Sequence, residues 1–235
     1  MTATDSCTDP GSEPCAAPSA ADPAVPPVGS LSPSRAADFM TCPLLYRFRC
    51  IDRLPERPSP EAVRGTVVHT VLERLFDLPP QQRTLTAAQA LVAPAWTDLC
   101  EAQPAVAAAA ADGVFGDQAS WLAGAEALLE RYFDLEDPRR LQPAERELAV
   151  EVVLDSGLRL RGVVDRLDVA PNGAVRVVDY KTGSAPAEAF EGRALFQMKF
   201  YALVLWRLHG TVPRLLQLVY LRDREILRYV PDEAD

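Results

Sequence analysis

The chain has 235 residues, of which 48% are hydrophobic, a length and composition typical of a globular protein with its own buried core. It contains neither an apolar run long enough to span a membrane nor the basic and apolar start of a secretory signal, so we expect a cytoplasmic protein without membrane contact. Its formal net charge of −9 argues against tight nonspecific DNA binding but is compatible with carboxylates that hold a divalent cation.

The N-terminal segment is expected to be a tail followed by a capped helix. Residues 1–30 are rich in Ala, Pro, Ser and Asp without periodicity, which predicts disorder. Ser32 can cap a helix whose first position is Pro33, and this helix should end near Cys42-Pro43. Residues 44–51 mix apolar and basic side chains and are compatible with either a helix or a strand.

A second helix is predicted over residues 60–77, because apolar residues recur there at helical spacing. His69 and Glu73 lie four residues apart and therefore share a face of this helix. The Ala-rich residues 84–135 are expected to form a helical insertion.

Strand periodicity replaces helical periodicity after this region. Residues 147–154 and 158–169 are predicted to form two strands joined by a turn at Asp155-Ser156-Gly157. Residues 174–181 should form a third strand after the turn signal Pro171-Asn172-Gly173. Adjacent strands with such short turns form an antiparallel meander.

The C-terminal part alternates again, with a long helix over 188–209 and two further strands over 215–221 and 225–230. The order of helices, three strands, helix and strands predicts a single α+β domain over residues 31–235, with a mixed or antiparallel sheet flanked by helices.

Two aspartates and a lysine occupy neighbouring predicted strands. Asp179 and Lys181 are two residues apart, so their side chains leave the strand on one face. A three-residue loop over 171–173, with Gly173 in the left-handed conformation, would set Asp165 directly across from Asp179. A two-residue loop would instead place the two carboxylates on opposite faces of the sheet.

Facing carboxylates beside a lysine suit phosphodiester hydrolysis, because two close aspartates repel unless a hard divalent cation lies between them. Such a cation would polarise the phosphoryl group, and Lys181 could orient the attacking water or stabilise developing charge. His69 could complete the coordination shell. The alternative is that these groups are cross-paired surface ions, although the apolar residues around Asp165 and Asp179 favour burial.

Several motifs occur in a fixed order, beginning with the Leu31-Ser-Pro-Ser34 segment. The others are Gly65-x-x-x-His69, Gly162-Val-Val-Asp165, Asp179-Tyr-Lys181 and Gln197-x-x-x-Tyr201. The set spans roughly residues 31–221 and resembles the RecB-like exonuclease branch of the PD-(D/E)xK nuclease superfamily. This resemblance implies the nuclease core of that superfamily.

The resemblance also implies roles for individual residues. Lys181 would be the catalytic lysine, and Gln197 and Tyr201, on one helix face, would contact the DNA or support Lys181. The implied ligands of Mg²⁺ or Mn²⁺ are His69, Asp165, Asp179 and the backbone carbonyl of Tyr180.

The function that follows is a divalent-metal-dependent DNA nuclease, an exonuclease of DNA repair or recombination that works with DNA and with a helicase or other repair subunit. A catalytically silent DNA-end or helicase-docking module on the same fold is the alternative, and hydrolysis of a small phosphodiester is a third. A groove walled by Arg35, Arg47, Arg49 and Arg64 would favour DNA, whereas their scatter would favour a small substrate.

The five cysteines are odd in number and scattered, which argues against a disulfide framework or a zinc site. Some members of the family bind an iron–sulfur cluster through one early cysteine and three late ones. Cys42 matches the early position, but no cysteine follows Cys100, so no cluster is expected in the chain as given. Cys42 is then expected to be a small buried apolar residue.

Overall fold

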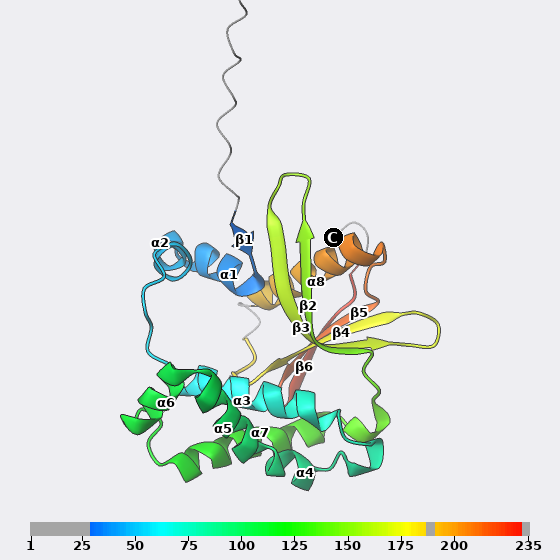
Figure 1. The fold of residues 1–235 in the computed structure, drawn as a ribbon. Helices are drawn as coiled ribbons and strands as arrows, with labels where there is room; N and C mark the ends of the chain where they lie inside the picture. The colour runs from blue at the N-terminus through cyan, green and yellow to red at the C-terminus, as the bar shows by residue number, and fades with distance from the viewer. Residues whose placement is uncertain (1–28, 187–190, 232–235) are drawn as a thin grey trace, which may run out of the picture.

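The computed structural model describes residues 29–186 and 191–231 and is drawn in Figure 1. The predicted tail therefore lies outside the described residues, apart from Gly29 and Ser30. Ser30 is already ordered in a short strand, where it pairs with Arg159. The first three residues of the helix predicted from 188 also lie outside the description.

A six-stranded mixed sheet forms the centre of the fold, as the α+β prediction requires. The strand order is β1-β3-β4-β5-β6, and β2 pairs with β3. The pairs β2–β3, β3–β4 and β5–β6 are antiparallel, which confirms the meander, whereas β1–β3 and β4–β5 are parallel. The strands are β1 Ser30–Leu31, β2 Glu145–Val153, β3 Arg159–Val169, β4 Val175–Lys181, β5 Leu215–Tyr220 and β6 Glu225–Tyr229.

Helices precede the meander and connect β4 to β5. The segment over 44–51, which the pattern left open, is helical: it forms α2 and a short π-helical turn. The helices are α1 Pro33–Thr41, α2 Pro43–Tyr46, η1 Arg47–Ile51, α3 Pro60–Leu75, α4 Leu85–Ala90, α5 Val92–Ala102, α6 Pro104–Ala111, α7 Gln118–Leu135 and α8 Glu191–His209, with short 3₁₀ turns at Pro80–Gln82 and Pro138–Arg140.

The start of α1 follows the predicted capping chemistry. The Ser32 hydroxyl accepts a hydrogen bond from the backbone amide of Arg35, and Pro33 occupies the first turn, where its missing amide hydrogen is not needed. Ser59 and Pro60 repeat this arrangement at the start of α3. In both cases a local sequence signal fixes where the helix begins.

The sheet separates two hydrophobic cores. Alternation along β4 sends Val178 and Tyr180 into the core formed with α3–α7, and sends Val177 into the core formed with α8. Figure 1 shows the layer of α3–α7 (cyan to green) on one side of the sheet and α8 (orange) on the other. No helix in the described ranges combines the length and the hydropathy that crossing a membrane requires.

The β3–β4 turn has the three-residue form that the proposed chemistry requires. The amide of Ala170 donates to the carbonyl of Ala174 at 2.9 Å, and Gly173 has a φ of 81°. The resulting ladder ends at the pair Arg166–Val178. Beyond this pair β3 stays paired with β2 and β4 with β5, and the predicted site residues Asp165 and Asp179 lie where β3 and β4 separate.

The prediction that Cys42 is buried is wrong. Cys42 caps α2 in an extended conformation at the α1–α2 junction and is exposed. The neighbouring Phe39, Met40 and Leu44 are exposed as well, because among the described residues no element covers this junction.

Candidate active site

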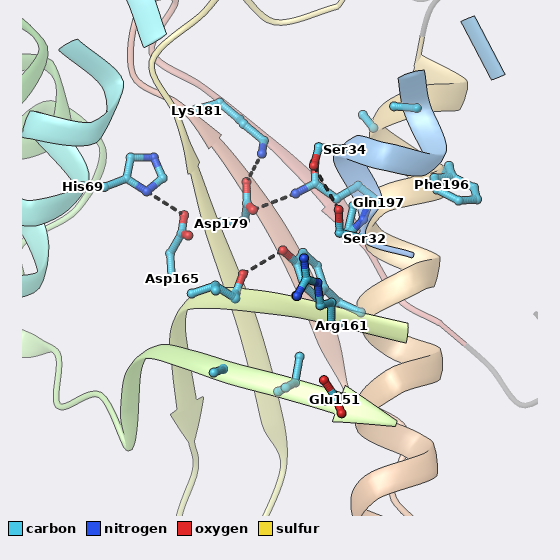
Figure 2. Close-up of a pocket in the computed structure, with 18 of the residues that line it drawn as sticks. Ser32, Ser34, His69, Glu151, Arg161, Asp165, Asp179, Lys181, Phe196 and Gln197 are labelled. Atoms are coloured by element: carbon cyan, nitrogen blue, oxygen red, sulfur yellow. Dashed lines mark hydrogen bonds and ion pairs between the residues drawn. The ribbon is translucent and has the colours of Figure 1, made fainter. Parts of the chain in front are cut away.

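A cavity of about 870 Å³ opens beside the end of the β3–β4 ladder. Its walls come from α1, α3, β2, β3, β4, β5 and α8, and the predicted residues His69, Asp165, Asp179, Lys181, Gln197 and Tyr201 all line it. Figure 2 shows the carboxylates of Asp165 and Asp179 facing the same space. The structure therefore brings together side chains that lie far apart in the sequence.

Asp179 is the most buried of these groups, with 4% of its surface exposed. Its two oxygens contact Lys181 Nζ at 2.5 Å and Gln197 Nε2, which donates at 2.7 Å. Burial raises the pKa of Asp179, the adjacent ammonium of Lys181 opposes this effect, and the charge of Asp165 adds to it. Asp179 is thus a carboxylate that needs positive charge near it.

Asp165 joins the sheet to α3. Its Oδ2 accepts a hydrogen bond from the backbone amide of Tyr180 at 2.6 Å and lies 3.4 Å from Nδ1 of His69. The other ring nitrogen of His69, Nε2, lies 3.0 Å from the carbonyl oxygen of Tyr180 and donates to it, because a carbonyl can only accept. Burial lowers the pKa of His69, but the hydrogen bond and charge of Asp165 outweigh this and raise it.

Glu147 belongs to the same cluster and was missed by the sequence analysis. Its Oε1 lies 4.0 Å from Nδ1 of His69, and donor atoms of His69, Glu147 and Asp165 all lie within 4.8 Å of one another. Burial and the charge of Asp165 raise the pKa of Glu147 to about 7.

The register of the β2–β3 hairpin could have identified this residue. The amide of Leu154 donates to the carbonyl of Leu158, so the turn holds three residues. Counting back from that turn sets Glu147 opposite Asp165, between the pairs Arg146–Arg166 and Leu148–Val164. The turn at 155–157 sets this register, as the turn at 171–173 sets that of β3 and β4.

Gln197 and Tyr201 act at different places. Gln197 contacts the carboxylate of Asp179, whereas the hydroxyl of Tyr201 donates to the carbonyl of Val163 at 2.7 Å. The ring of Tyr201 packs on Gly162, where an added Cβ would lie only 2.9 Å from it. Gly162 thus permits the close approach that fixes α8 against β3, and Tyr201 lines the cavity from that position.

A buried ion-pair network lies behind the site. Arg166 is 1% exposed and contacts both carboxylate oxygens of Glu136, at 2.7 and 2.9 Å. It also donates to the hydroxyl of Tyr180, and its Nε lies 3.2 Å from Asp168. The Tyr180 side chain is therefore held on the α3–α7 side of the sheet while its carbonyl faces His69.

The four arginines considered as a DNA-binding wall do not line the cavity, so the groove that would have favoured DNA over a small substrate is not formed by them. Arg35 donates to Ser30, Arg47 to Asp52, and Arg49 to Asp38 and Glu56, while Arg64 lies over the ring of Trp121. Among the side chains that the structure describes, the basic ones that do line it are Arg161, Lys181 and His69.

The donor set fits a hard divalent cation. It combines carboxylate oxygens, a backbone carbonyl oxygen and one imidazole, and carboxylate and carbonyl ligands suit Mg²⁺ and Mn²⁺. Burial, and after it the negative charge of Asp165, raises the pKa of Glu147. A cation bound at this place would stabilise the charged form of Glu147.

Comparison with known proteins agrees with the arrangement. No curated protein matches the chain. A family model described as the PD-(D/E)XK nuclease superfamily matches residues 30–234, a range that runs from β1 past the end of β6 and includes every residue that lines the cavity. The chain therefore belongs to the PD-(D/E)XK nuclease superfamily.

Proposed function

We propose that this protein is a divalent-metal-dependent DNA nuclease of the RecB-like branch, and that it acts as an exonuclease in DNA repair or recombination. The observation that carries the proposal is the convergence of His69, Glu147 and Asp165 within 4.8 Å, beside the ion pair of Asp179 and Lys181. The resemblance to RecB-like enzymes supports the choice of DNA as substrate.

The ligands of the cation would be His69, Asp165, Asp179 and the carbonyl oxygen of Tyr180, with Glu147 as a further ligand. When bound, Mg²⁺ or Mn²⁺ supplies positive charge that polarises the phosphoryl group and makes water easier to deprotonate. His69 already bridges Asp165 and the Tyr180 carbonyl, so the protein holds these donors at one place through contacts of its own.

Lys181 and Gln197 would act on either side of Asp179. The ammonium of Lys181 is partly exposed to the cavity, where it can hold the attacking water or stabilise the charge that develops on the phosphate oxygens. Gln197 fixes the orientation of the Asp179 carboxylate through its hydrogen bond. Tyr201 would be a positioning residue, because it holds α8 against β3.

The test is degradation of end-labelled single- and double-stranded DNA with Mg²⁺ or Mn²⁺, with and without a chelator. We expect metal-dependent cleavage that Asp179→Ala reduces by more than about a hundredfold, since losing even a residue that only supports a ligand costs about 10- to 100-fold. Asp155→Ala is the matched control, because that carboxylate is 95% exposed in the β2–β3 turn.

Two results would contradict the proposal. Cleavage that survives Asp179→Ala would mean that another site or a contaminant cuts the DNA. A folded wild-type protein that binds DNA ends but never cuts would instead favour the DNA-end or helicase-docking module.

A further inference from the structure

Arg161 is a cation in the active-site cavity that the proposed chemistry does not use. It lies on β3 and is exposed, and the part of the chain that the structure describes offers it no ion pair or hydrogen bond. The other two basic side chains among the described residues that line the cavity are engaged, Lys181 with Asp179 and His69 with Asp165. Figure 2 shows Arg161 rising from β3 on the side of the cavity where Ser32 and Gln197 lie.

The acidic residue across from Arg161 on the adjacent strand, Glu151, forms an ion pair with a different arginine. Glu151 lies directly across from Arg161 in the β2–β3 register, yet its carboxylate pairs with Arg159 at 3.3 Å. The cavity wall also carries the carboxylates of Asp165 and Asp179. An anionic substrate must therefore pass several negative groups, and Arg161 is a positive group among the described side chains that could receive it away from the proposed metal-binding end.

The position of Arg161 on β3, relative to Asp165, determines which part of a bound substrate its side chain can contact. Arg161, Val163 and Asp165 alternate onto the same face, and at about 3.3 Å per residue the Cα atoms of Arg161 and Asp165 lie roughly 13 Å apart. This separation offsets Arg161 along the strand from the phosphate that would be hydrolysed at Asp165. It suits another phosphate of the same strand.

The surface between these two positions is apolar. Val163 is 44% exposed although it lies in the middle of a strand, and it lines the cavity together with Ala149. An exposed apolar floor between a cation and a metal-binding cluster matches a nucleotide, whose sugar and base are less polar than its phosphates.

We propose that Arg161 and Val163 form a nucleotide subsite, in which Arg161 binds a phosphate of the DNA strand next to the one that is cleaved. The proposal rests on the nuclease function proposed above. A guanidinium suits this role because it presents a planar fork of donors to phosphate oxygens.

The experiment compares wild type with Arg161→Gln, Arg161→Lys and Arg228→Gln in cleavage of an end-labelled oligonucleotide with Mn²⁺. Arg228 is the matched control: it is an exposed strand arginine on β6, it does not line the cavity, and no ion pair or hydrogen bond is found for it within the described ranges. Arg161→Gln should raise KM roughly tenfold with little change in kcat, because a charge-assisted contact made equally in ground and transition states is lost. The KM of Arg161→Lys should lie between those of wild type and Arg161→Gln, and the KM of Arg228→Gln should match that of wild type.

Binding measured with Ca²⁺ in place of Mn²⁺, as a function of salt, gives a second readout. Loss of one phosphate contact should lower the slope of log affinity against log salt by about 0.7 to 0.9. If wild type cuts but Arg161→Gln and Arg228→Gln are equal in KM and slope, the subsite is overturned while the nuclease stands. If wild type binds without cutting, the slope still decides the role of Arg161; if it neither binds nor cuts, both proposals fail.

Discussion

Glu147 combines two features that are unfavourable in isolation. It has a φ of 45° within a strand, in the left-handed region that costs a residue other than glycine about 1–3 kcal/mol. Its carboxylate is also half-buried next to that of Asp165, which raises its pKa to about 7. The strained backbone and the partial burial both accompany the position of Glu147 beside His69 and Asp165. A bound cation would offset the unfavourable burial of its charge.

We therefore expect Glu147→Gln to raise the Mn²⁺ concentration for half-maximal cleavage about 10- to 100-fold, with folding intact. Metal titrations of the nuclease activity measure this. Glu145→Gln, an exposed residue at the start of the same strand, should leave the titration unchanged. Equal titrations for the two variants would remove Glu147 from the metal-binding cluster.

The same carboxylates predict how stability depends on pH without metal. Carboxyl groups of an unfolded chain titrate near pH 4, whereas the pKa of Glu147 is about 7 and that of Asp179 is raised by burial. The folded protein thus holds more protons between these values, so its free energy of unfolding falls as pH rises through this window. His69 acts in the same direction, because its raised pKa makes the protonated contact with Asp165 stabilising at low pH only.

In a chelator, the melting temperature should fall between about pH 5 and about pH 7.5, and less so in Glu147→Gln. Mn²⁺ should stabilise wild type more at the higher pH, because it replaces bound protons. A pH profile that is the same in wild type and Glu147→Gln would show that Glu147 does not titrate in this range.

At the scale of the elements, α7 is tied to the sheet at two points of different character. Glu136, directly after α7, pairs with the buried Arg166 of β3. Asp134, within α7, pairs with Arg224 at 2.5 Å, and both of these side chains are 51% exposed. The first contact is enclosed by the core that also holds the Tyr180 ring, and the second faces solvent.

These two contacts should differ sharply in energy. Arg166→Leu leaves Glu136 and Asp168 without their buried partner and should cost about 3–5 kcal/mol in unfolding free energy. Arg224→Leu should cost less than about 1 kcal/mol. Urea unfolding of both variants measures the difference, and a similar small loss for both would mean that the buried network does not hold α7 against β3.

At the scale of the molecule, the site draws on both helical layers and on the sheet between them. His69 comes from α3 in one layer, Gln197 from α8 in the other, and the carboxylates from strands that separate at the end of their ladder. The site can therefore exist only when both cores have formed around the sheet.

Sequence patterns predicted the parts of this arrangement that depend on local signals. The cap of α1, the three strands and the turn signal at 171–173 follow from short-range chemistry. The sequence left open whether that turn held two or three residues, and the structure shows the three-residue form that brings Asp165 and Asp179 together. The rest depends on contacts between distant residues. The pairing of Arg166 with Glu136, 30 residues earlier, and the exposure of Cys42 depend on which elements pack together, which no local pattern encodes.

The sequence contains two lysines, Lys181 and Lys199, and the Lys181 side chain is 31% exposed within the cavity. An amine-selective acetylating reagent therefore has one side-chain target at the proposed centre, Lys181 on β4, and one internal reference, Lys199 on α8. Peptide mass spectrometry should show slower acetylation of Lys181 relative to Lys199 when an oligonucleotide is bound with Ca²⁺. An unchanged ratio would indicate that the nucleic acid does not enter the cavity, so chemical footprinting could locate the substrate before any turnover is measured.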